Sequence, residues 1–315
     1  MGESYTVSAA LLAHYRATAR DLPWRHTRDP YAVLVSEVML QQTQASRVAP
    51  AFERFMGRFP TLKALASAPL AAVLREWSGL GYNRRARALH LIAKQCPDGL
   101  PSDVAALDAL PGIGAYTAGA VASFAFGQPV AFADVNIRRV LGRVFLGRPG
   151  TTQEATDLDG AAMPKHGSDQ WHHALMDLGA TICIARTPKC AACPLRTLCL
   201  FARSPAVGGP LRFPLPGPSA EGTPGSAAKG TRRPPSRTGR VTRRAAGPVA
   251  RPAAYSSSDR RIRGAIVRAL VHAEDGLTPR ALEKAIDDPR VGRLIDALTA
   301  DGLVEHAGRR VRLAT

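Results

Sequence analysis

The sequence of 315 residues contains no run of about 20 consecutive apolar residues, the length that a membrane-spanning helix requires. Its N-terminal segment lacks a basic stretch followed by an apolar one, so we expect no secretory signal peptide. Long alternating runs of β-branched residues are also missing, which argues against strands as the main elements. We therefore expect a soluble cytoplasmic protein that is built mainly from α-helices and has no membrane partner.

Acidic residues are scarce relative to basic ones. The chain has 25 Asp and Glu residues against 42 Lys and Arg residues, which gives a formal net charge of +17 and a sequence pI of about 10.6. Lys and Arg side chains gain affinity for a phosphate chain because their binding releases condensed counterions. The excess therefore favours a nucleic acid partner, although a charge that only keeps the protein soluble would look the same.

Composition divides the chain into regions. Residues 1–202 alternate helical patterns with short Gly and Pro punctuation, so we expect one large helical domain there. Residues 203–257 are rich in Pro, Gly, Ser, Ala and Arg and contain ten basic residues but only one acidic residue. Such a segment buries too little apolar surface to fold, and we expect a disordered basic linker. It would either contact DNA non-specifically or act only as a tether.

Residues 258–315 again have the pattern of a folded segment. We expect three short helices, over 259–272, from Thr278 and Pro279 onward, and over 290–300. A small hairpin should follow around Ala307 and Gly308. This outline is typical of a winged-helix module, and a small helical bundle without a DNA role fits the same pattern.

Most of the cysteines are concentrated in one short segment. Of the five in the chain, four lie within 17 residues: Cys183, Cys190, Cys193 and Cys199. Four thiolates this close in a reducing compartment indicate that they bind one metal centre, and four cysteines bind either zinc or a 4Fe-4S cluster. Because the spacing fits neither pattern fully, it leaves both open, beside the alternative of four buried thiols without a metal.

A Pro-Gly-rich turn separates two helical patterns at Leu110-Pro111-Gly112-Ile113-Gly114. Pro111 prevents the preceding helix from continuing, and the two glycines let the backbone approach a ligand without a Cβ in between. The free N–H groups at the start of the next helix suit a phosphate oxygen. We therefore expect a helix–hairpin–helix that grips DNA without reading its sequence, while a plain helix connector would use the same turn.

Two carboxylates are candidates for chemistry. Glu37 lies inside the apolar helical pattern YAVLVSEVMLQQTQ, where partial desolvation would favour its protonated form and suit a general acid. Gln41 would follow one helical turn later on the same face and could bond to a base edge. Asp134 directly precedes another helical pattern. The plainer interpretations are a polar helix face for Glu37 and a helix N-cap for Asp134.

These motifs occur together in an order that resembles the MutY adenine DNA glycosylases, members of the helix–hairpin–helix superfamily that also contains endonuclease III. The resemblance covers roughly residues 20–200 and rests on LPWRHTRDPYAVLVSEVMLQQTQ, REWSGLGYNRRARALH, LPGIGAYTAGAVASFAFG, FADVNIRRVLGRVF and ALMDLGATICIARTPKCAACPLRTLC. It implies a two-lobed helical glycosylase fold, with a catalytic domain over 1–202 that includes an iron–sulfur loop at 183–199. It also implies a monomer, associated with the nucleoid, that removes adenine mispaired with 8-oxoguanine or guanine from double-stranded DNA.

The resemblance also implies a role for each matching residue. Glu37 resembles the acid that protonates adenine at a ring nitrogen, and Asp134 resembles the carboxylate that stabilises the sugar oxocarbenium. Tyr116 and Asn136 match positions that support this chemistry. Tyr82 matches the aromatic wedge beside the base opposite the flipped adenine. The remaining matches are Gln41 and Gln42, which would line the space left by that adenine, and Cys183, Cys190, Cys193 and Cys199, which would bind the 4Fe-4S cluster.

The chain departs from the family pattern at two places. Endonuclease III-like enzymes carry a nucleophilic Lys where this chain has Tyr116, so we expect base removal without a Schiff-base lyase step. The residues after 258 are too few for the NUDIX-like domain with which many MutY proteins read 8-oxoguanine. A thymine glycosylase acting on T·G mispairs is the nearest rival, but thymine lacks the purine nitrogen that Glu37 would protonate. A non-catalytic, cluster-bearing DNA-binding protein is the second rival.

Overall fold

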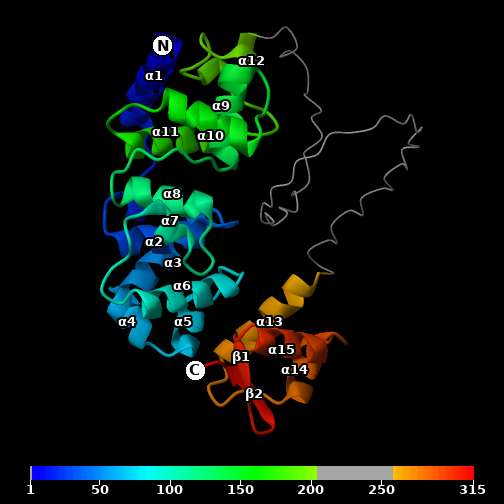
Figure 1. The fold of residues 1–315 in the computed structure, drawn as a ribbon. Helices are drawn as coiled ribbons and strands as arrows, with labels where there is room; N and C mark the ends of the chain where they lie inside the picture. Colours follow the sequence, from blue (N-terminus) through cyan, green and yellow to red (C-terminus); the bar gives the residue numbers. More distant parts are fainter. Residues whose placement is uncertain (1, 204–257) are drawn as a thin grey trace, which may run out of the picture.

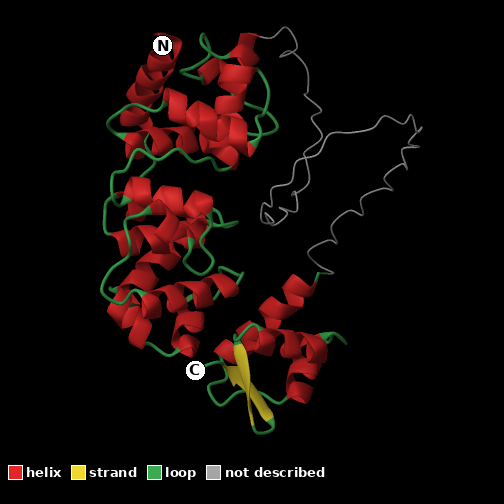
Figure 2. Cartoon of the chain, in the orientation of Figure 1, coloured by secondary structure: helices red, strands yellow, loops and turns green. Residues whose placement is uncertain are grey.

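The computed structural model describes residues 2–203 and 258–315, and the predicted linker lies almost wholly outside them. The first part is helical (Figures 1 and 2). Its elements are α1 (Gly2–Thr18), η1 (Pro23–Arg25), α2 (Pro30–Leu40), α3 (Ala45–Arg58), α4 (Leu62–Ser67), α5 (Leu70–Glu76), α6 (Arg84–Gln95), α7 (Val104–Asp108), α8 (Ala115–Phe124), α9 (Val135–Leu146), α10 (Thr152–Ala162), α11 (Ser168–Thr181), η2 (Cys190–Ala192) and α12 (Leu200–Arg203).

These helices form two lobes (Figure 1). The helices from α2 to α8 lie together in one lobe, while α1 packs with α10 and α11 in the other, beside α9 and α12. Trp77 and Phe55, whose ring centroids are 5.9 Å apart, are fully buried in the first lobe, and Trp171 is fully buried in the second. Because buried aromatic rings contribute large apolar areas, each lobe has an apolar core of its own. The predicted two-lobed helical fold is confirmed.

Helix α2 carries Glu37 through the core of the first lobe. It begins where Asp29 accepts hydrogen bonds from the N–H groups of Tyr31 and Ala32, with Pro30 at the first helical position. Every residue from Tyr31 to Met39 is buried. The helix therefore has no solvent-facing polar side at Glu37, which excludes that plainer interpretation of the carboxylate.

The prediction that this helix continues through Gln41 is wrong. The helix ends at Leu40, Gln41 is its C-cap, and Gln42 has a left-handed backbone with φ of 56°. The cause is Arg85, whose guanidinium donates to the carbonyl oxygens of Val38, Met39 and Gln41 at 2.8, 2.9 and 2.5 Å. These carbonyl oxygens accept hydrogen bonds from a side chain outside the helix, so they do not need the backbone N–H groups of a further helical turn.

The C-terminal elements match the sequence prediction. They are α13 (Asp259–Val271), α14 (Pro279–Ile286), α15 (Val291–Ala300), β1 (Val304–Ala307) and β2 (Arg310–Leu313). The two strands pair antiparallel, with Val304 opposite Leu313, and Leu277 adds an isolated bridge to Val311. The predicted helices and hairpin are confirmed. The bridge places Leu277 beside the hairpin, where a winged-helix module has a short third strand. Assignment to that module stays a prediction.

The C-terminal helices pack against the first lobe, where α13 and β2 contact α5. Asp301, directly after α15, accepts hydrogen bonds from Arg84 of α6, at 2.6 Å, and from Arg263 of α13. Within residues 2–203 and 258–315, no helix is both long enough and apolar enough to cross a membrane.

Candidate active site

Glu37 is a buried carboxyl group that accepts one hydrogen bond from within the described part of the chain. Its side chain is on α2 and is 5% exposed, and the hydroxyl of Tyr116 on α8 donates to its Oε2 atom at 3.2 Å. Burial raises the pKa of Glu37 from 4.5 to about 7; the Tyr116 hydrogen bond lowers this pKa and the charge of Asp134 raises it further. The raised pKa favours the protonated form of this carboxyl group, which is the form that a general acid needs.

Asp134 caps α9 and accepts three hydrogen bonds. Its Oδ1 atom accepts from the backbone N–H groups of Asn136 and Ile137 at 2.8 and 2.7 Å, and its Oδ2 atom accepts from the Asn136 side-chain amide at 2.8 Å. Three N–H donors and a helix N-terminus suit an ionised carboxylate. The N-cap interpretation from the sequence is therefore correct, and the cap lies close enough to Glu37 to raise its pKa.

The charge of Asp134 raises the pKa of both Glu37 and Tyr116, so these three side chains lie near one another although they come from two lobes. Glu37 and Tyr116 come from α2 and α8 of the first lobe, and Asp134 comes from the start of α9 in the second (Figure 1). The burial of Tyr116 and the charges of Glu37 and Asp134 together raise the pKa of its hydroxyl well above 10, so Tyr116 stays a hydrogen-bond donor. The arrangement thus combines a proton donor, a neutral hydroxyl and a hydrogen-bonded carboxylate at one place.

A buried network supports the chain segment that leads to Asp134. Asp159 accepts hydrogen bonds from the Phe132 backbone N–H at 3.1 Å, the Trp171 ring N–H at 2.7 Å and His172 at 2.8 Å. The ring of Phe132 stacks on His172, with centroids 4.0 Å apart, and meets the ring of Tyr116 edge-on at 5.5 Å. Asp159 and His172 are both fully buried. This network holds the segment before Asp134 and one side of the Tyr116 ring.

Two loops near the site carry residues with left-handed backbones. Gln42 has a φ of 56° and Tyr82 a φ of 49°, conformations that L residues adopt only where the surroundings enforce them. Gln41 donates from its side-chain amide to the hydroxyl of Thr117 at 3.3 Å. Arg85 joins the loops, because besides the α2 carbonyls it donates to the Gly81 carbonyl at 3.1 Å and lies over the Tyr82 ring at 5.2 Å. The sequence prediction placed Gln41, Gln42 and Tyr82 at one site, and they do lie around this arginine.

The Pro-Gly turn has the predicted form of a hairpin between helices. The preceding helix ends at Asp108, slightly before the predicted Leu110, and α8 starts after the exposed Gly114. Gly112 has a φ of 74°, and a Cβ there would lie 2.9 Å from that of Ala88, so this position requires glycine. Gly114 has open space around its Cα, which leaves room for a ligand to approach.

The four clustered cysteines line one cavity. Cys183, Cys190, Cys193 and Cys199 surround it together with Arg143 and Phe201. Arg143 donates to the Cys183 sulfur at 3.4 Å and to the Ile184 and Ala185 carbonyls at 2.8 Å, and Cys199 donates to the Arg143 carbonyl at 3.4 Å. Among the described residues, no three His, Cys, Asp or Glu side chains are grouped to hold a single metal ion. Four thiols around one cavity are a donor set that a 4Fe-4S cluster uses and that zinc uses as well.

Comparison with known proteins identifies the family. Residues 35–161 match the model of the HhH-GPD superfamily base excision DNA repair proteins. The adenine DNA glycosylase of Mycobacterium tuberculosis strain H37Rv is 36% identical over 315 residues, which span 96% of this chain and 91% of that protein. This chain belongs to the adenine DNA glycosylase family. It is therefore a DNA N-glycosylase of base excision repair, as the sequence resemblance implied.

Other relatives place this glycosylase among known folds. The human adenine DNA glycosylase is 43% identical over 209 residues, 60% of this chain and 38% of the human protein. A solved thermostable thymine-DNA glycosylase has a TM-score of 0.59 and 29% identity, covering 64% of this chain and 97% of that one. An endonuclease III trapped as a covalent intermediate on DNA has a TM-score of 0.55 and 26% identity, with 64% and 97% of the two chains covered.

Sequence reasoning missed the residues that hold the site of this glycosylase together. Arg85, Arg139 and Asp159 carry no motif of their own, and in the sequence they look like ordinary helix-surface charges. Arg139 donates to the Asn136 side chain at 2.8 Å and to the Cys183 carbonyl at 2.7 Å, which links the Asp134 cap to the cysteine loop. Only long-range contacts identify such residues, and no local pattern predicts them.

Proposed function

We propose that this glycosylase removes adenine mispaired with 8-oxoguanine or guanine from double-stranded DNA, by hydrolysis of the N-glycosidic bond. The observation that carries the proposal is the buried Glu37 carboxyl group, whose pKa is raised to about 7 beside Tyr116 and Asp134. Adenine leaves poorly as an anion, and a proton on one of its ring nitrogens makes it a neutral leaving group. The identity of the relatives as adenine DNA glycosylases supports adenine as this base.

The proposed reaction uses the two carboxylates in opposite roles. Glu37 donates its proton to an adenine ring nitrogen, and the glycosidic electron pair leaves with the base. The sugar becomes an oxocarbenium ion, and the anionic Asp134 stabilises its positive charge. Water then adds to the anomeric carbon and loses a proton to the Glu37 carboxylate, which restores the proton donor and leaves a neutral abasic sugar. Tyr116 offers a hydroxyl in place of an amine, so no Schiff base forms and the DNA strand stays uncut.

The loops around Arg85 supply the second part of the proposal. Adenine must leave the base stack before Glu37 can reach it, which costs a few kcal/mol and costs less for a mispaired base. Tyr82 would enter the duplex beside the opposite base, and Gln41 and Gln42 would line the space that adenine leaves. The N–H groups of Gly112 and Gly114 would bind a backbone phosphate and offset part of this cost, whereas the Ile113 N–H donates to the Leu110 carbonyl at 3.1 Å. Such a substrate would place the enzyme with the nucleoid. We also propose that it acts as a monomer, as the family resemblance implies.

The four cysteines would hold a 4Fe-4S cluster. The donor set, the shared cavity and the arginine contacts to Cys183 fit such a group. When bound, the cluster would fix the fold of the loop, since its ligation cross-links four positions between 183 and 199. Purified protein should contain iron and acid-labile sulfide in equal amounts, and Cys199→Ser should lower both. Zinc in place of iron would contradict this assignment.

The proposed function is tested by base release under single-turnover conditions. Duplexes carrying A·8-oxoguanine, A·G, A·C or T·G should release adenine from the first two most readily and no thymine from the last. The T·G duplex is a necessary arm, because a thymine-DNA glycosylase is among the similar solved structures. Thymine release with no adenine release would contradict the proposal and favour the rival.

The role of Asp134 is tested by Asp134→Asn. Asn caps helices about as well as Asp, so this change should preserve α9 and DNA binding while it removes the negative charge and abolishes adenine release. Asp103 provides a matched control, since it caps α7 through the Ala106 N–H but lies outside the site. Asp103→Asn should keep full activity. Full activity of Asp134→Asn would rule out its assigned role.

A further inference from the structure

A wide groove runs between the loops around Arg85 and the C-terminal helix α13. It has a volume of about 870 Å³, and its walls come from residues 42–44, Arg47, residues 78–85, α13, and Leu298 and Leu303. The C-terminal residues that form one wall are held in place by Asp301 and by Gly302. Gly302 has a φ of 62°, and a Cβ there would lie 2.8 Å from the Arg87 guanidinium, so the chain passes close to α6.

The groove is strongly basic. Its walls contain six arginines and no Asp or Glu among the described residues: Arg47, Arg84, Arg85, Arg260, Arg263 and Arg268. Asp301 lies nearby and pairs with two of them, Arg84 and Arg263. The other four leave a net positive charge, which suits a ligand with several negative charges in a row.

At Tyr82 the two walls of the groove contact each other. The Arg260 guanidinium, from the first turn of α13, lies over the Tyr82 ring at 4.6 Å, and Arg85 approaches the same ring at 5.2 Å. Cation–π contacts of this kind place both guanidinium groups beside the aromatic ring. A ligand that contacts Tyr82 from the groove side would therefore lie beside Arg260.

We propose that this groove binds the DNA strand opposite the excised base, and that α13 contributes Arg260 and Arg268 to hold its phosphates and the nucleotide beside Tyr82. This inference rests on the proposed function, which brings Tyr82 against that strand. Guanidinium groups bind phosphate oxygens in pairs and also match the Hoogsteen edge of a guanine, so both parts of a nucleotide have a partner here. The C-terminal residues thereby form part of the DNA site.

Salt dependence of binding tests the proposal. The probe is a duplex with 2′-fluoro-2′-deoxyadenosine opposite guanine, because the fluorine destabilises an oxocarbenium ion and prevents base loss. The double variant Arg260→Ala/Arg268→Ala should reduce the slope of log Kd against log salt by about 2, close to one for each phosphate that the variant no longer neutralises. Hydroxyl-radical footprints should lose protection on the strand opposite the fluoroadenosine.

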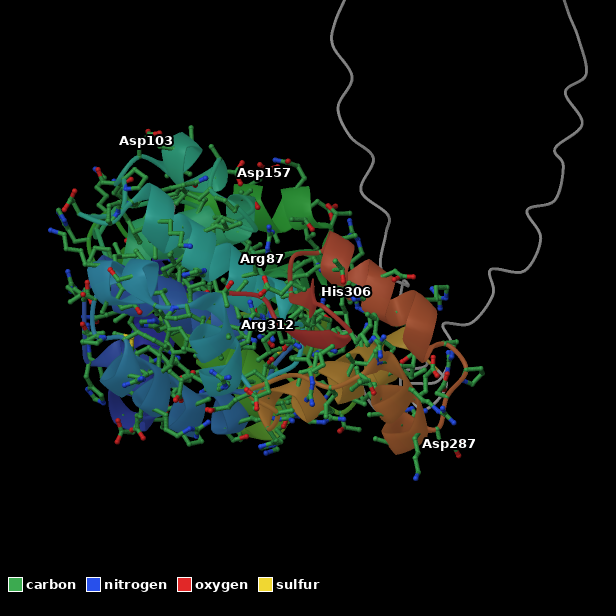
Figure 3. The ribbon with its side chains drawn as sticks, turned by 90° about the horizontal axis from the view of Figure 1, so that it is seen from below. Arg87, Asp103, Asp157, Asp287, His306 and Arg312 are labelled. Carbon is green, nitrogen blue, oxygen red and sulfur yellow. The ribbon has the colours of Figure 1, made fainter. Side chains whose placement is uncertain are left out.

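A second double variant provides the matched control. Arg280→Ala/Lys284→Ala removes the same charge from α14, whose side chains are exposed at both positions and do not line the groove. In Figure 3, Asp287, directly after α14, lies at the outer edge of the C-terminal helices, whereas Arg87 lies among the helices of the first lobe. The control should keep the wild-type slope and footprint. Equal slope changes in both variants, or a loss of protection only on the adenine strand, would overturn the proposal.

The outcomes separate this inference from the proposed function. If the wild-type protein releases adenine and the Arg260/Arg268 variant binds with an unchanged slope, the groove assignment is wrong and the chemistry stands. If the wild-type protein releases no adenine but the slope still depends on Arg260 and Arg268, the proposed function is wrong and the groove still binds DNA. Thermal unfolding of both variants confirms that each is folded.

Discussion

At the scale of single residues, burial of the Glu37 carboxyl group costs folding free energy and also gives it the raised pKa that the proposed reaction requires. Its carboxyl group is buried in α2 among apolar side chains, and the charged form is disfavoured there. A protein with no use for this group would gain stability from an apolar or amide side chain at the same place. The retained carboxyl is therefore the clearest sign of function in the fold.

This cost predicts how stability changes with pH. Because the folded-state pKa is about 7 against an ordinary 4.5, the contribution of Glu37 to folding is fully present below about pH 4.5 and is lost as the pH rises through 7. Glu37→Gln should remove this dependence. The unfolding free energy of the variant minus that of the wild-type protein should therefore increase by about 3 kcal/mol from about pH 4.5 to about pH 8. Urea unfolding at both pH values measures the difference. The exposed Glu53 on α3 gives the control variant Glu53→Gln, and equal behaviour of the two variants would exclude the burial argument.

The buried Asp159 predicts a loss of stability. It accepts hydrogen bonds from three buried groups, and Asp159→Ala would leave all three donors without an acceptor. We expect a destabilisation of about 3–5 kcal/mol, as for other broken buried networks. Asp157, exposed on the same helix and labelled in Figure 3, supplies the control Asp157→Ala. Chemical denaturation measures both, and a loss below about 1 kcal/mol for Asp159→Ala would contradict the network's role.

At the scale of elements, Arg85 decides the shape of both loops beside the site. It satisfies carbonyl groups at the end of α2 and in the loop before α6, and Lys lacks the forked donors to do the same. Both Arg85→Ala and Arg85→Lys should therefore speed hydrogen exchange at the Thr43 and Leu80 amides, which donate to Leu40 and Trp77 at 3.1 Å. Exchange at α9 should not change. Wild-type exchange in the Lys variant would show that charge alone holds the loops.

The elements also show what sequence patterns can and cannot predict. The helical class, the C-terminal helices and hairpin, and the Asp134 cap follow from periodicity, capping residues and turns, which are local properties. The end of α2 at Leu40 does not follow from the local pattern because its cause, Arg85, lies more than 40 residues away in the chain. The meeting of Glu37 with Asp134 followed only from the family resemblance, since no local rule brings two lobes together. Roles assigned to Tyr82, Gln41 and Gln42 stay predictions.

At the scale of the whole molecule, the basic charge and the C-terminal residues act together. The chain carries a net charge of +17, and the residues after 202 contribute much of the excess through the linker. Deleting residues 203–315 should leave base release at saturating enzyme intact but weaken DNA binding and reduce its salt dependence. Fluorescence anisotropy at several salt concentrations measures both. If the truncated protein binds DNA with the wild-type affinity and the wild-type slope of log Kd against log salt, the C-terminal residues do not contribute to DNA binding.

In the proposed mechanism, adenine release depends on Glu37 as the proton donor. A pH profile of the single-turnover rate constant tests this most directly, because the donor must be protonated to act. The rate constant should be level in mild acid and fall about tenfold per pH unit above an apparent pKa near 7, the value that burial gives Glu37. A single-turnover rate constant that stays the same from mild acid to mild base would contradict the role of Glu37 as the proton donor.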